Sequence, residues 1–400
     1  MKFERLENKI IQVRGISYKP IDISSSPLPG YIPLLKANNI QESGIDTSDL
    51  VYIHRDKVKP EQFIKKGDLL LAASSGSKEI VGKNIYFEED FDGTFGAFCK
   101  LVRPKKNINP RYLAIFFKSV LYKRHIKKLL SGVLINNLKN EHIDSLLIPE
   151  ITDSEQLHIA KILSKAENLI TKRKESIRLL DEFLKSTFLE MFGDPVRNVR
   201  RWEVISIKKY GSLKNGLNYT KDENGVNIRC LGVGDFKDLS KLTDIGSLQI
   251  ITLTHPPSEE YYLKDFDLVF VRSNGNKELV GRCILVLPKS AKVTFSGFCI
   301  RYRITEKGID PVYLSHLFRV PIFRKSMLKD GKGANIQNIN QQILESLKIP
   351  LPPVELQSKF AQIVEKTEAF KIQYQQSLQE LENLYGNLSQ RAFKGELTLK

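Results

Sequence analysis

The sequence has little cysteine and histidine, and it has no long apolar run. Its four cysteines form no Cys-x-x-Cys pair and its six histidines are scattered, so the sequence indicates neither a zinc site nor a disulfide framework. We expect the cysteines to be reduced and mostly buried. No run of eighteen apolar residues occurs, and residues 1–11 carry charges where a signal peptide needs an apolar core. These absences predict a cytoplasmic protein.

Common catalytic motifs are also missing. The chain has no His-Glu-x-x-His, no Gly-x-Ser-x-Gly and no Asn-Pro-Pro-Tyr, the tetrapeptide expected of an adenine methyltransferase. A phosphate loop is excluded because five residues separate Gly76 from Gly82, and Asn84 stands where Ser or Thr should bind magnesium. Asp235 lacks a partner carboxylate at a spacing that suits a nuclease metal site. We therefore expect a protein without catalytic or metal-binding residues.

The charge that is present is mostly positive. The chain has 62 basic and 46 acidic residues, for a net charge of +16. Segments 155–194 and 355–396 contribute 0 and −1, so the rest of the chain carries +17. Lysines that serve only solubility would also produce this excess, but its confinement to the presumed globular parts favours a polyanion such as nucleic acid as the partner.

Two segments, residues 155–194 and 355–395, have apolar residues that recur every seven positions. In the first segment this row consists of Leu163, Ile170, Ile177, Leu184 and Met191; the second segment has Val364, Leu378 and Tyr385 in a corresponding row. This pattern predicts two long helices that pair as a coiled coil. Two unrelated amphipathic helices, each packed on its own domain, are the alternative.

The globular parts are an internal repeat. Residues 68–83 align with residues 267–282, and eight of the sixteen positions are identical where chance would give about one. Residues 94–99 match 294–299, residues 110–113 match 311–314, and residues 145–149 match 346–350, always at an offset of 200 or 201. The order along the chain is therefore module, helix, module, helix.

Each module is predicted to be mixed α/β. In the first module we expect strands at 31–35, 68–73 and 94–99 and a helix over 110–130. The predicted fold class is α+β, with two similar mixed α/β modules separated by a pair of long antiparallel coiled-coil helices in a pseudo-two-fold repeat. The predicted boundaries are 1–150, 151–195, 196–350 and 351–400. Paired helices would hold the two basic modules at a fixed separation, which suits duplex DNA with its repeat of about 34–36 Å.

Candidate DNA-binding residues lie in the glycine loops and in other polar loops, because Asn, Arg, Ser and Lys are the types that reach base edges and phosphates. In the first module they are Arg14, Tyr18, Lys19, Lys36, Asn38, Ser74, Ser75, Ser77, Lys78 and Lys83. In the second module they are Asn218, Tyr219, Lys221, Arg229, Arg272, Ser273, Asn274, Asn276, Lys277, Arg282, Lys332, Asn335 and Gln337. The alternative for each is an ordinary turn or solvated loop.

Several short sequence motifs, by their order and duplication, resemble those of the DNA specificity subunits of type I restriction-modification systems. They are Lys66-Gly-Asp-Leu-Leu70, Glu155-Gln156, Met191-Phe-Gly-Asp-Pro195 and Ile349-Pro-Leu-Pro-Pro353. The likeness covers essentially the whole chain. The sequence departs from the pattern in three places. It has Glu355-Leu-Gln357 where an adjacent Glu-Gln is usual, and the start of the first helix lacks the second proline pair. The first module also has no counterpart to Trp202.

The resemblance implies a non-catalytic subunit with two target recognition domains, each followed by a conserved helical region. Such a chain would recognise a bipartite, asymmetric sequence in double-stranded DNA and would dock two methyltransferase subunits and, through them, restriction and translocase subunits. It would bind no cofactor itself, whereas its partners would use S-adenosylmethionine, ATP and Mg²⁺. A stand-alone DNA-binding nuclease and a coiled-coil protein scaffold are the alternative functions.

Overall fold

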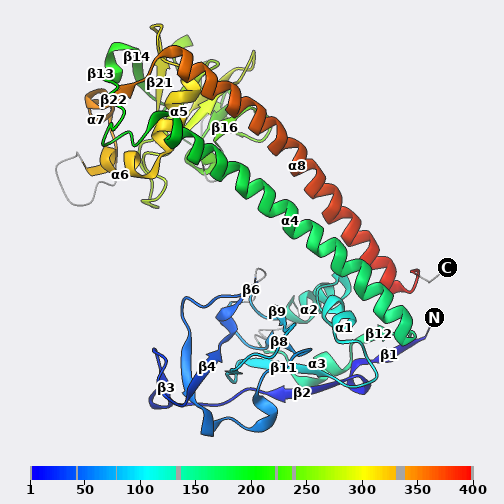
Figure 1. Ribbon diagram of the computed structural model, residues 1–400. Coiled ribbons are helices and arrows are strands. Elements are labelled where there is room, and N and C mark those ends of the chain that lie inside the picture. The colour runs from blue at the N-terminus through cyan, green and yellow to red at the C-terminus, as the bar shows by residue number, and fades with distance from the viewer. Residues whose placement is uncertain are drawn as a thin grey trace. The chain divides into compact units, whose positions relative to one another are not determined.

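The computed structural model describes residues 2–41, 44–77, 79–131, 137–220, 224–236, 240–329 and 338–397. The chain forms two compact units: unit 1 comprises residues 1–174 and 376–400, and unit 2 comprises residues 175–375. The boundary falls inside two long helices, α4 (Asp153–Phe192) and α8 (Val354–Lys394), so each unit contains one globular module and one end of each helix (Figure 1). Among the described residues, no helix has the length and the apolar character needed to cross a membrane.

The module of unit 1 contains two sheets and two short strand pairs among its described residues. The first sheet has the order β2 (Ile10–Arg14), β11 (Cys99–Pro104), β8 (Leu69–Ala72) and β9 (Asn84–Tyr86), with antiparallel neighbours. The second has the order β10 (Thr94–Phe95), β4 (Tyr31–Leu35), β7 (Val51–His54) and β3 (Ile23–Ser24), with β10 parallel to β4. The pairs are β1 (Phe3–Arg5) with β12 (Leu147–Pro149) and β5 (Ile40–Gln41) with β6 (Gly44–Ile45).

The module of unit 2 repeats this plan in the part that the structure describes. Its larger sheet has the order β14 (Gly211–Asn215), β21 (Cys299–Ile304), β18 (Asp267–Val271), β19 (Cys283–Val286) and β16 (Lys241–Leu242). Its smaller sheet has the order β17 (Gln249–Leu253), β15 (Val226–Leu231) and β20 (Val293–Phe295), and β13 (Glu203–Ser206) pairs with β22 (Lys348–Leu351). The predicted internal repeat is thereby confirmed in three dimensions.

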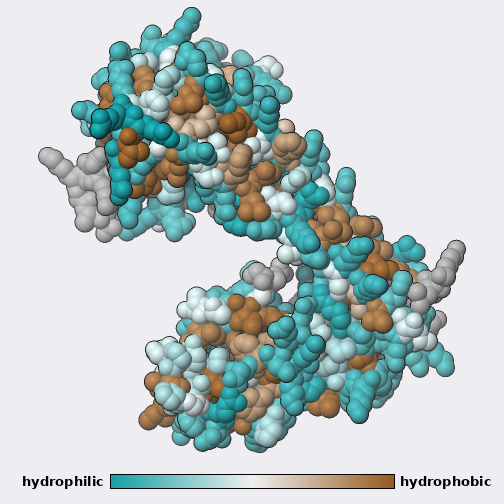
Figure 2. Space-filling view, viewed as in Figure 1, coloured by the Kyte–Doolittle hydropathy of each residue, from teal (hydrophilic) through white to brown (hydrophobic). Residues whose placement is uncertain are grey.

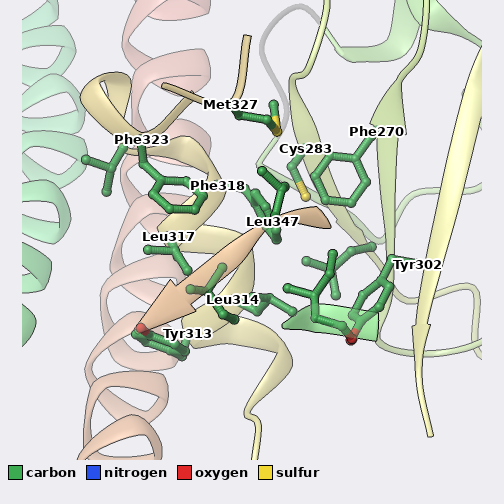
Figure 3. Packing of buried hydrophobic residues seen from close by; sticks show 14 of the residues in the cluster. Phe270, Cys283, Tyr302, Tyr313, Leu314, Leu317, Phe318, Phe323, Met327 and Leu347 are labelled. Atoms are coloured by element: carbon green, nitrogen blue, oxygen red, sulfur yellow. The ribbon is translucent and has the colours of Figure 1, made fainter. Parts of the chain in front are cut away.

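Short helices cover one face of the β2–β11–β8–β9 sheet in unit 1 and of the larger sheet in unit 2. They are α1 (Pro110–Phe116), α2 (Val120–Ser131) and α3 (Asn140–Asp144) in unit 1, and α5 (Pro311–Arg319), α6 (Pro321–Lys329) and α7 (Gln341–Ser346) in unit 2. Figure 3 shows how α5 fills the core of unit 2: Leu314, Leu317 and Phe318 lie among Phe270 and Tyr302 of the sheet. Each such side chain contributes about 1.5–3 kcal/mol of hydrophobic free energy when fully buried. The surface is mostly hydrophilic on the face seen in Figure 2.

Two of the predicted elements are interrupted. The predicted helix over 110–130 is wrong as a single element, because residues 117–119 separate α1 from α2, and Ser119 Oγ accepts a hydrogen bond from Tyr122 N at the start of α2. The predicted strand over 94–99 also breaks, since Cys99 N donates to Gly96 O at 2.8 Å and closes a tight turn. The strand predicted at 31–35 is confirmed as β4.

A buried ion pair occupies the same place in both modules. Asp68 and Asp267, which begin the repeated segment, are each 1% exposed. Arg103 and Arg303 donate to both oxygens of these carboxylates, at 2.7–2.9 Å. A buried carboxylate needs this pairing to offset its lost hydration. The two aspartates therefore belong to the framework of the repeat and are structural.

The long helices pair with each other within each unit, and they run antiparallel there. In unit 1, Tyr385 Oη of α8 donates to Glu167 of α4, and Lys174 forms an ion pair with Glu382 at 2.8 Å. In unit 2, Lys371 pairs with Asp181 at 2.7 Å, and further along, the rings of Phe188 and Phe360 pack edge to face. As the residue numbers rise along α4, those of its partners on α8 fall. The predicted antiparallel pairing is confirmed within each unit.

Side chains at the helix ends explain the repeated Gln and the single Trp. Gln156 and Gln357 lie one turn into α4 and α8, and each accepts a hydrogen bond from the residue before α1 or α5, Asn109 N or Asp310 N, at 2.7–2.8 Å. Gln357 thus fills the role of Gln156 although its neighbours differ. Trp202 Nε1 donates to Phe192 O, the last carbonyl of α4, and α4 stops there because Gly193 adopts a positive φ of 78°.

Candidate nucleic-acid interface

Three segments that are distant in sequence meet at one edge of the unit 1 module. They are the glycine loop that follows β8 (residues 73–77), the turn between β10 and β11 (96–98) and the segment that follows β2 (15–19). Ala73 N and Ser74 N both donate to Phe98 O, at 2.9 and 3.0 Å, and Ala97 N donates to Ile16 O at 2.9 Å. We call these three segments the loop surface of unit 1. Backbone hydrogen bonds join the three segments, so the loop side chains can vary without loss of these bonds.

The loop surface of unit 2 has the same hydrogen-bond pattern, with residues 272–276, 296–298 and 216–219. Arg272 N donates to Phe298 O at 2.8 Å, and Gly297 N donates to Leu217 O at 2.6 Å. Segments 15–19 and 216–219 begin with Gly15 and Gly216. A β-carbon at either glycine would come within 2.1–2.2 Å of a carbonyl oxygen of the turn. Glycine is therefore required at both positions.

The loop surfaces bring together many of the predicted DNA-binding residues. In unit 1 these are Tyr18, Lys19, Ser74, Ser75 and Ser77, and in unit 2 they are Asn218, Tyr219, Arg272, Ser273, Asn274 and Asn276. The Tyr18 ring lies against Gly96 of the turn. Burial raises the pKa of Tyr219, whose hydroxyl interacts with Cys230 and Ser296 of its own module. Both surfaces thus present hydroxyl donors beside short polar loops.

The loop side chains also shape their own backbone. Ser75 Oγ accepts from Ser77 N at 3.2 Å, and the equivalent Asn274 Oδ1 accepts from Asn276 N at 2.7 Å. An asparagine side chain carries two N–H donors in addition to this oxygen. The whole carboxamide group, oxygen and N–H together, is what pairs with adenine. Arg272 is half-buried, and its Nη1 lies 3.5 Å from Gly297 O, at the limit of a hydrogen bond. The guanidinium can therefore leave this contact at little cost.

Other predicted residues use their polar atoms within the fold. Lys36 forms an ion pair with Asp49 at 2.7 Å, and Asn38 donates to the same carboxylate at 3.3 Å. Arg229 donates to the carbonyls of residues 246 and 248, and Arg282 donates to those of residues 236 and 278. These contacts stabilise loops and strands of their own module, so sequence reasoning did not separate structural from outward-facing cations.

The remaining predicted residues are cations on the surface or lie outside the described residues. Arg14 and Lys277 are exposed, as is Lys19 of the loop surface, and Lys83 is half-buried. Exposed cations of this kind suit phosphate contacts, which position a protein on DNA without selecting bases. Lys78, Lys221, Lys332, Asn335 and Gln337 lie outside the described residues.

Sequence reasoning missed residues that lie in or beside the two loop surfaces. Asn137 and Asn338 are exposed and pair in register with Ser74 and Ser273. Phe98 and Phe298 form the turns and are exposed. The signal was present, since both phenylalanines belong to the repeated Thr-Phe-x-x-Phe-Cys segment, which the sequence suggested only as framework.

A duplicated cleft lies between each module and the helices of its own unit. In unit 1 it has a volume of about 980 Å³, and its lining includes Lys83, Lys118, Lys123, Lys127 and Glu167. In unit 2 it has a volume of about 340 Å³, and its lining includes the matching residues Arg282, Arg319, Arg324 and Glu368. Each cleft therefore has an excess of cations that the repeat has retained, with Lys in one copy and Arg in the other.

The cysteines lie in the apolar cores of the modules. The four cysteines are buried as predicted, and burial raises the pKa of Cys99 and of Cys230 to about 12, so neither thiol is a nucleophile. Within the described ranges, no group of three or more His, Cys, Asp or Glu side chains is arranged to hold a metal ion. What the surfaces offer is hydrogen bonding, charge and an exposed ring.

Comparisons with known proteins agree with this picture. Residues 27–179 and 200–383 each match the family described as the type I restriction modification DNA specificity domain. The chain is 31% identical over 405 residues to the EcoKI specificity subunit of Escherichia coli, and 30% identical over 411 residues to the StySPI specificity subunit of Salmonella potsdam. Each alignment covers 96% of this chain and 87% of the relative.

Solved structures show the same fold. A chain from a study of complex assembly and conformational transition of the type I restriction-modification system superposes with a TM-score of 0.61. The match covers 99% of this chain and 98% of that one at 16% sequence identity. With two copies of the specificity domain and relatives of this similarity along nearly its whole length, the chain belongs to the family of type I restriction-modification DNA specificity subunits.

Proposed function

We propose that this chain recognises a bipartite, asymmetric sequence in double-stranded DNA, one half-site for each loop surface, and that partner subunits supply all catalysis. The observation that carries the proposal is the pair of loop surfaces, which share one backbone framework but differ in side chains. Ser75 and Ser77 of unit 1 correspond to Asn274 and Asn276 of unit 2, and Ala73 corresponds to Arg272. Two equal frameworks with different donors prefer different bases.

Charge supports DNA as the ligand. The segments outside the two long helices carry a net charge of +17, and Arg14, Lys19 and Lys277 are exposed on the modules. Cations of this kind neutralise phosphates and release counterions, so binding should weaken steeply as salt increases. A protein-only scaffold would show no such dependence.

The decisive experiment exchanges one loop between the copies. The triple variant Arg272→Ala, Asn274→Ser and Asn276→Ser gives residues 272–276 the sequence of residues 73–77, on an unchanged backbone framework. The variant is purified with the methyltransferase of the same system, and methylated adenines are mapped on genomic DNA. We expect one half of the methylated motif to change and the other half to persist. A motif that is unchanged, or changed in both halves, would contradict the proposal.

The duplicated clefts support docking of two copies of a partner, because two equivalent sites on one chain fit two identical subunits. Their cations suit an acidic segment of a methyltransferase subunit. Lys123 and Lys127 of α2 are exposed and line the cleft of unit 1. The double variant Lys123→Glu and Lys127→Glu should reduce the complex from two methyltransferase subunits to one, as measured by native mass spectrometry.

A matched control lies on the same helix. Arg124 is exposed but does not line the cleft, so Arg124→Glu changes the charge of α2 by half as much as the double variant does, without touching the site. We expect this control to retain two copies. Equal loss in both variants would show that general charge, not the cleft, governs assembly.

A further inference from the structure

An exposed phenylalanine stands at the centre of each loop surface. Phe98 is 66% exposed and Phe298 is 62% exposed, whereas Phe95 and Phe295, three residues earlier in the same repeated segment, are fully buried. A side chain that remains in water gains none of the hydrophobic free energy that burial would supply. The folded module therefore gives no reason for a phenylalanine at either position.

The backbone around each ring is held from several directions. Phe98 O accepts hydrogen bonds from Ala73 N and Ser74 N, and the turn is closed by the hydrogen bond from Cys99 N to Gly96 O. In unit 2, Phe298 O accepts from Arg272 N, and Phe298 N donates to Ser296 Oγ at 3.3 Å. A ring on such a rigid turn loses little conformational entropy on binding, because only its own two side-chain torsions have to be ordered.

The neighbours of the ring indicate DNA as the partner. The carbonyl of Phe298 is hydrogen-bonded by the backbone of Arg272, and Tyr18 packs on the turn that carries Phe98. An isolated exposed ring among hydroxyls, amides and a guanidinium differs from a protein interface, whose buried core is apolar. Exposed apolar residues such as Phe183 and Phe370 lie instead on the long helices, where they are accessible to a protein partner.

We propose that Phe98 and Phe298 insert into the DNA groove and contact bases, each in the half-site of its own unit. Phenylalanine is used in this way by proteins that place an apolar wedge at a base step. The contact adds affinity for DNA without a further charge, and the polar loop beside it selects the sequence. This inference rests on the proposed function, and it assigns a role to residues that neither charge nor hydrogen bonding would select.

The test compares Phe298→Ala with Phe266→Ala in the complex of the full-length chain with its methyltransferase. Phe266 is 50% exposed and precedes β18, whereas Arg272 follows it, so the control ring lies at the opposite end of the same strand. Binding to a duplex that contains the methylated motif is measured at several salt concentrations. We expect Phe298→Ala to weaken binding about 5- to 150-fold, which corresponds to the roughly 1–3 kcal/mol of one aromatic contact with a base.

Three further readouts identify the contact. The slope of log affinity against log salt should stay unchanged, because the ring releases no counterions. The thermal unfolding transition should also stay unchanged, since the side chain is exposed. Phe298→Trp should retain most of the affinity, and Phe98→Ala should weaken binding in the same way through the other half-site.

The outcomes separate this inference from the proposed function. If the unmodified complex binds its motif specifically and Phe298→Ala binds equally well, the inference is wrong and the proposed function stands. The same conclusion follows if Phe266→Ala causes an equal loss, or if Phe298→Ala loses the methyltransferase while DNA binding by the chain is unaffected. If the unmodified complex shows no preference for any sequence, both fail.

Discussion

Arg272 is the residue for which the structure allows the sharpest prediction about recognition. It opens the glycine loop of unit 2, where unit 1 has Ala73, and its guanidinium donates to Gly297 O at 3.5 Å, the limit of a hydrogen bond. Arg272→Ala therefore removes this marginal hydrogen bond from the fold. We expect the free energy of unfolding to change by no more than about 0.5 kcal/mol.

The expected effect on DNA binding is larger. An arginine that forms two hydrogen bonds with guanine discriminates against other bases by about 1–3 kcal/mol, which is a factor of roughly 5–150. Arg272→Ala should therefore lower affinity for the correct motif and leave affinity for other sequences nearly the same. Competition binding with duplexes mutated singly at each position of the motif would show the preference relaxed at one position.

A matched variant distinguishes base recognition from charge. Lys277→Ala removes the same charge from an exposed position of the same loop. A phosphate contact there would weaken binding to all sequences alike and reduce the salt slope by about 0.9. If Arg272→Ala behaves in this second way, with a uniform loss and a lower slope, then Arg272 binds phosphate and our reasoning about its role is refuted.

Three predictions concern stability. Asp267→Asn leaves the Arg303 guanidinium without its buried carboxylate and should cost about 3 kcal/mol in chemical denaturation, whereas a loss below 1 kcal/mol would contradict the buried pair. Burial lowers the pKa of His316 to about 3. Between pH 6.5 and 3 the imidazole is therefore protonated in the unfolded chain but stays neutral in the folded protein. Stability should fall as pH falls from 6.5 toward 3, by up to about 1.4 kcal/mol per pH unit, and His316→Gln should flatten this part of the profile. Phe188→Ala removes a fully buried ring that packs on Phe360, and calorimetry should show a loss of about 3–5 kcal/mol in the transition of unit 2; an unchanged transition would disprove the helix contact.

The polar framework of the repeat was partly readable from the sequence. Asp68 and Asp267 head the aligned segments, and both prove to be buried partners of arginine, which explains why the duplication kept them. The apparent departure at Gln357 has a similar explanation. Its side chain makes the same hydrogen bond as Gln156, so contact geometry was retained although the order of neighbouring residues was not.

The sequence by itself determined the features that depend on local periodicity. A seven-residue apolar repeat is a property of one helix, and it predicted α4 and α8 and their partnership. α4 ends close to the predicted boundary at residue 195, because Gly193 adopts a positive φ that ends a helix locally. The duplicated plan also followed from spacing alone, since equal offsets between matching residues require no knowledge of contacts.

Only the tertiary structure decided how the loops meet and which side chains face outward. The turn at 96–98 exists because distant backbone groups at residues 16, 73 and 74 hydrogen-bond to it, and local residue preference could not reveal those partners. In the same way, the sequence could not distinguish Arg282, whose donors are used on carbonyls of its own module, from exposed Arg14. A cation looks the same in a sequence whether its hydrogen bonds go to the fold or to solvent, and long-range packing makes that choice.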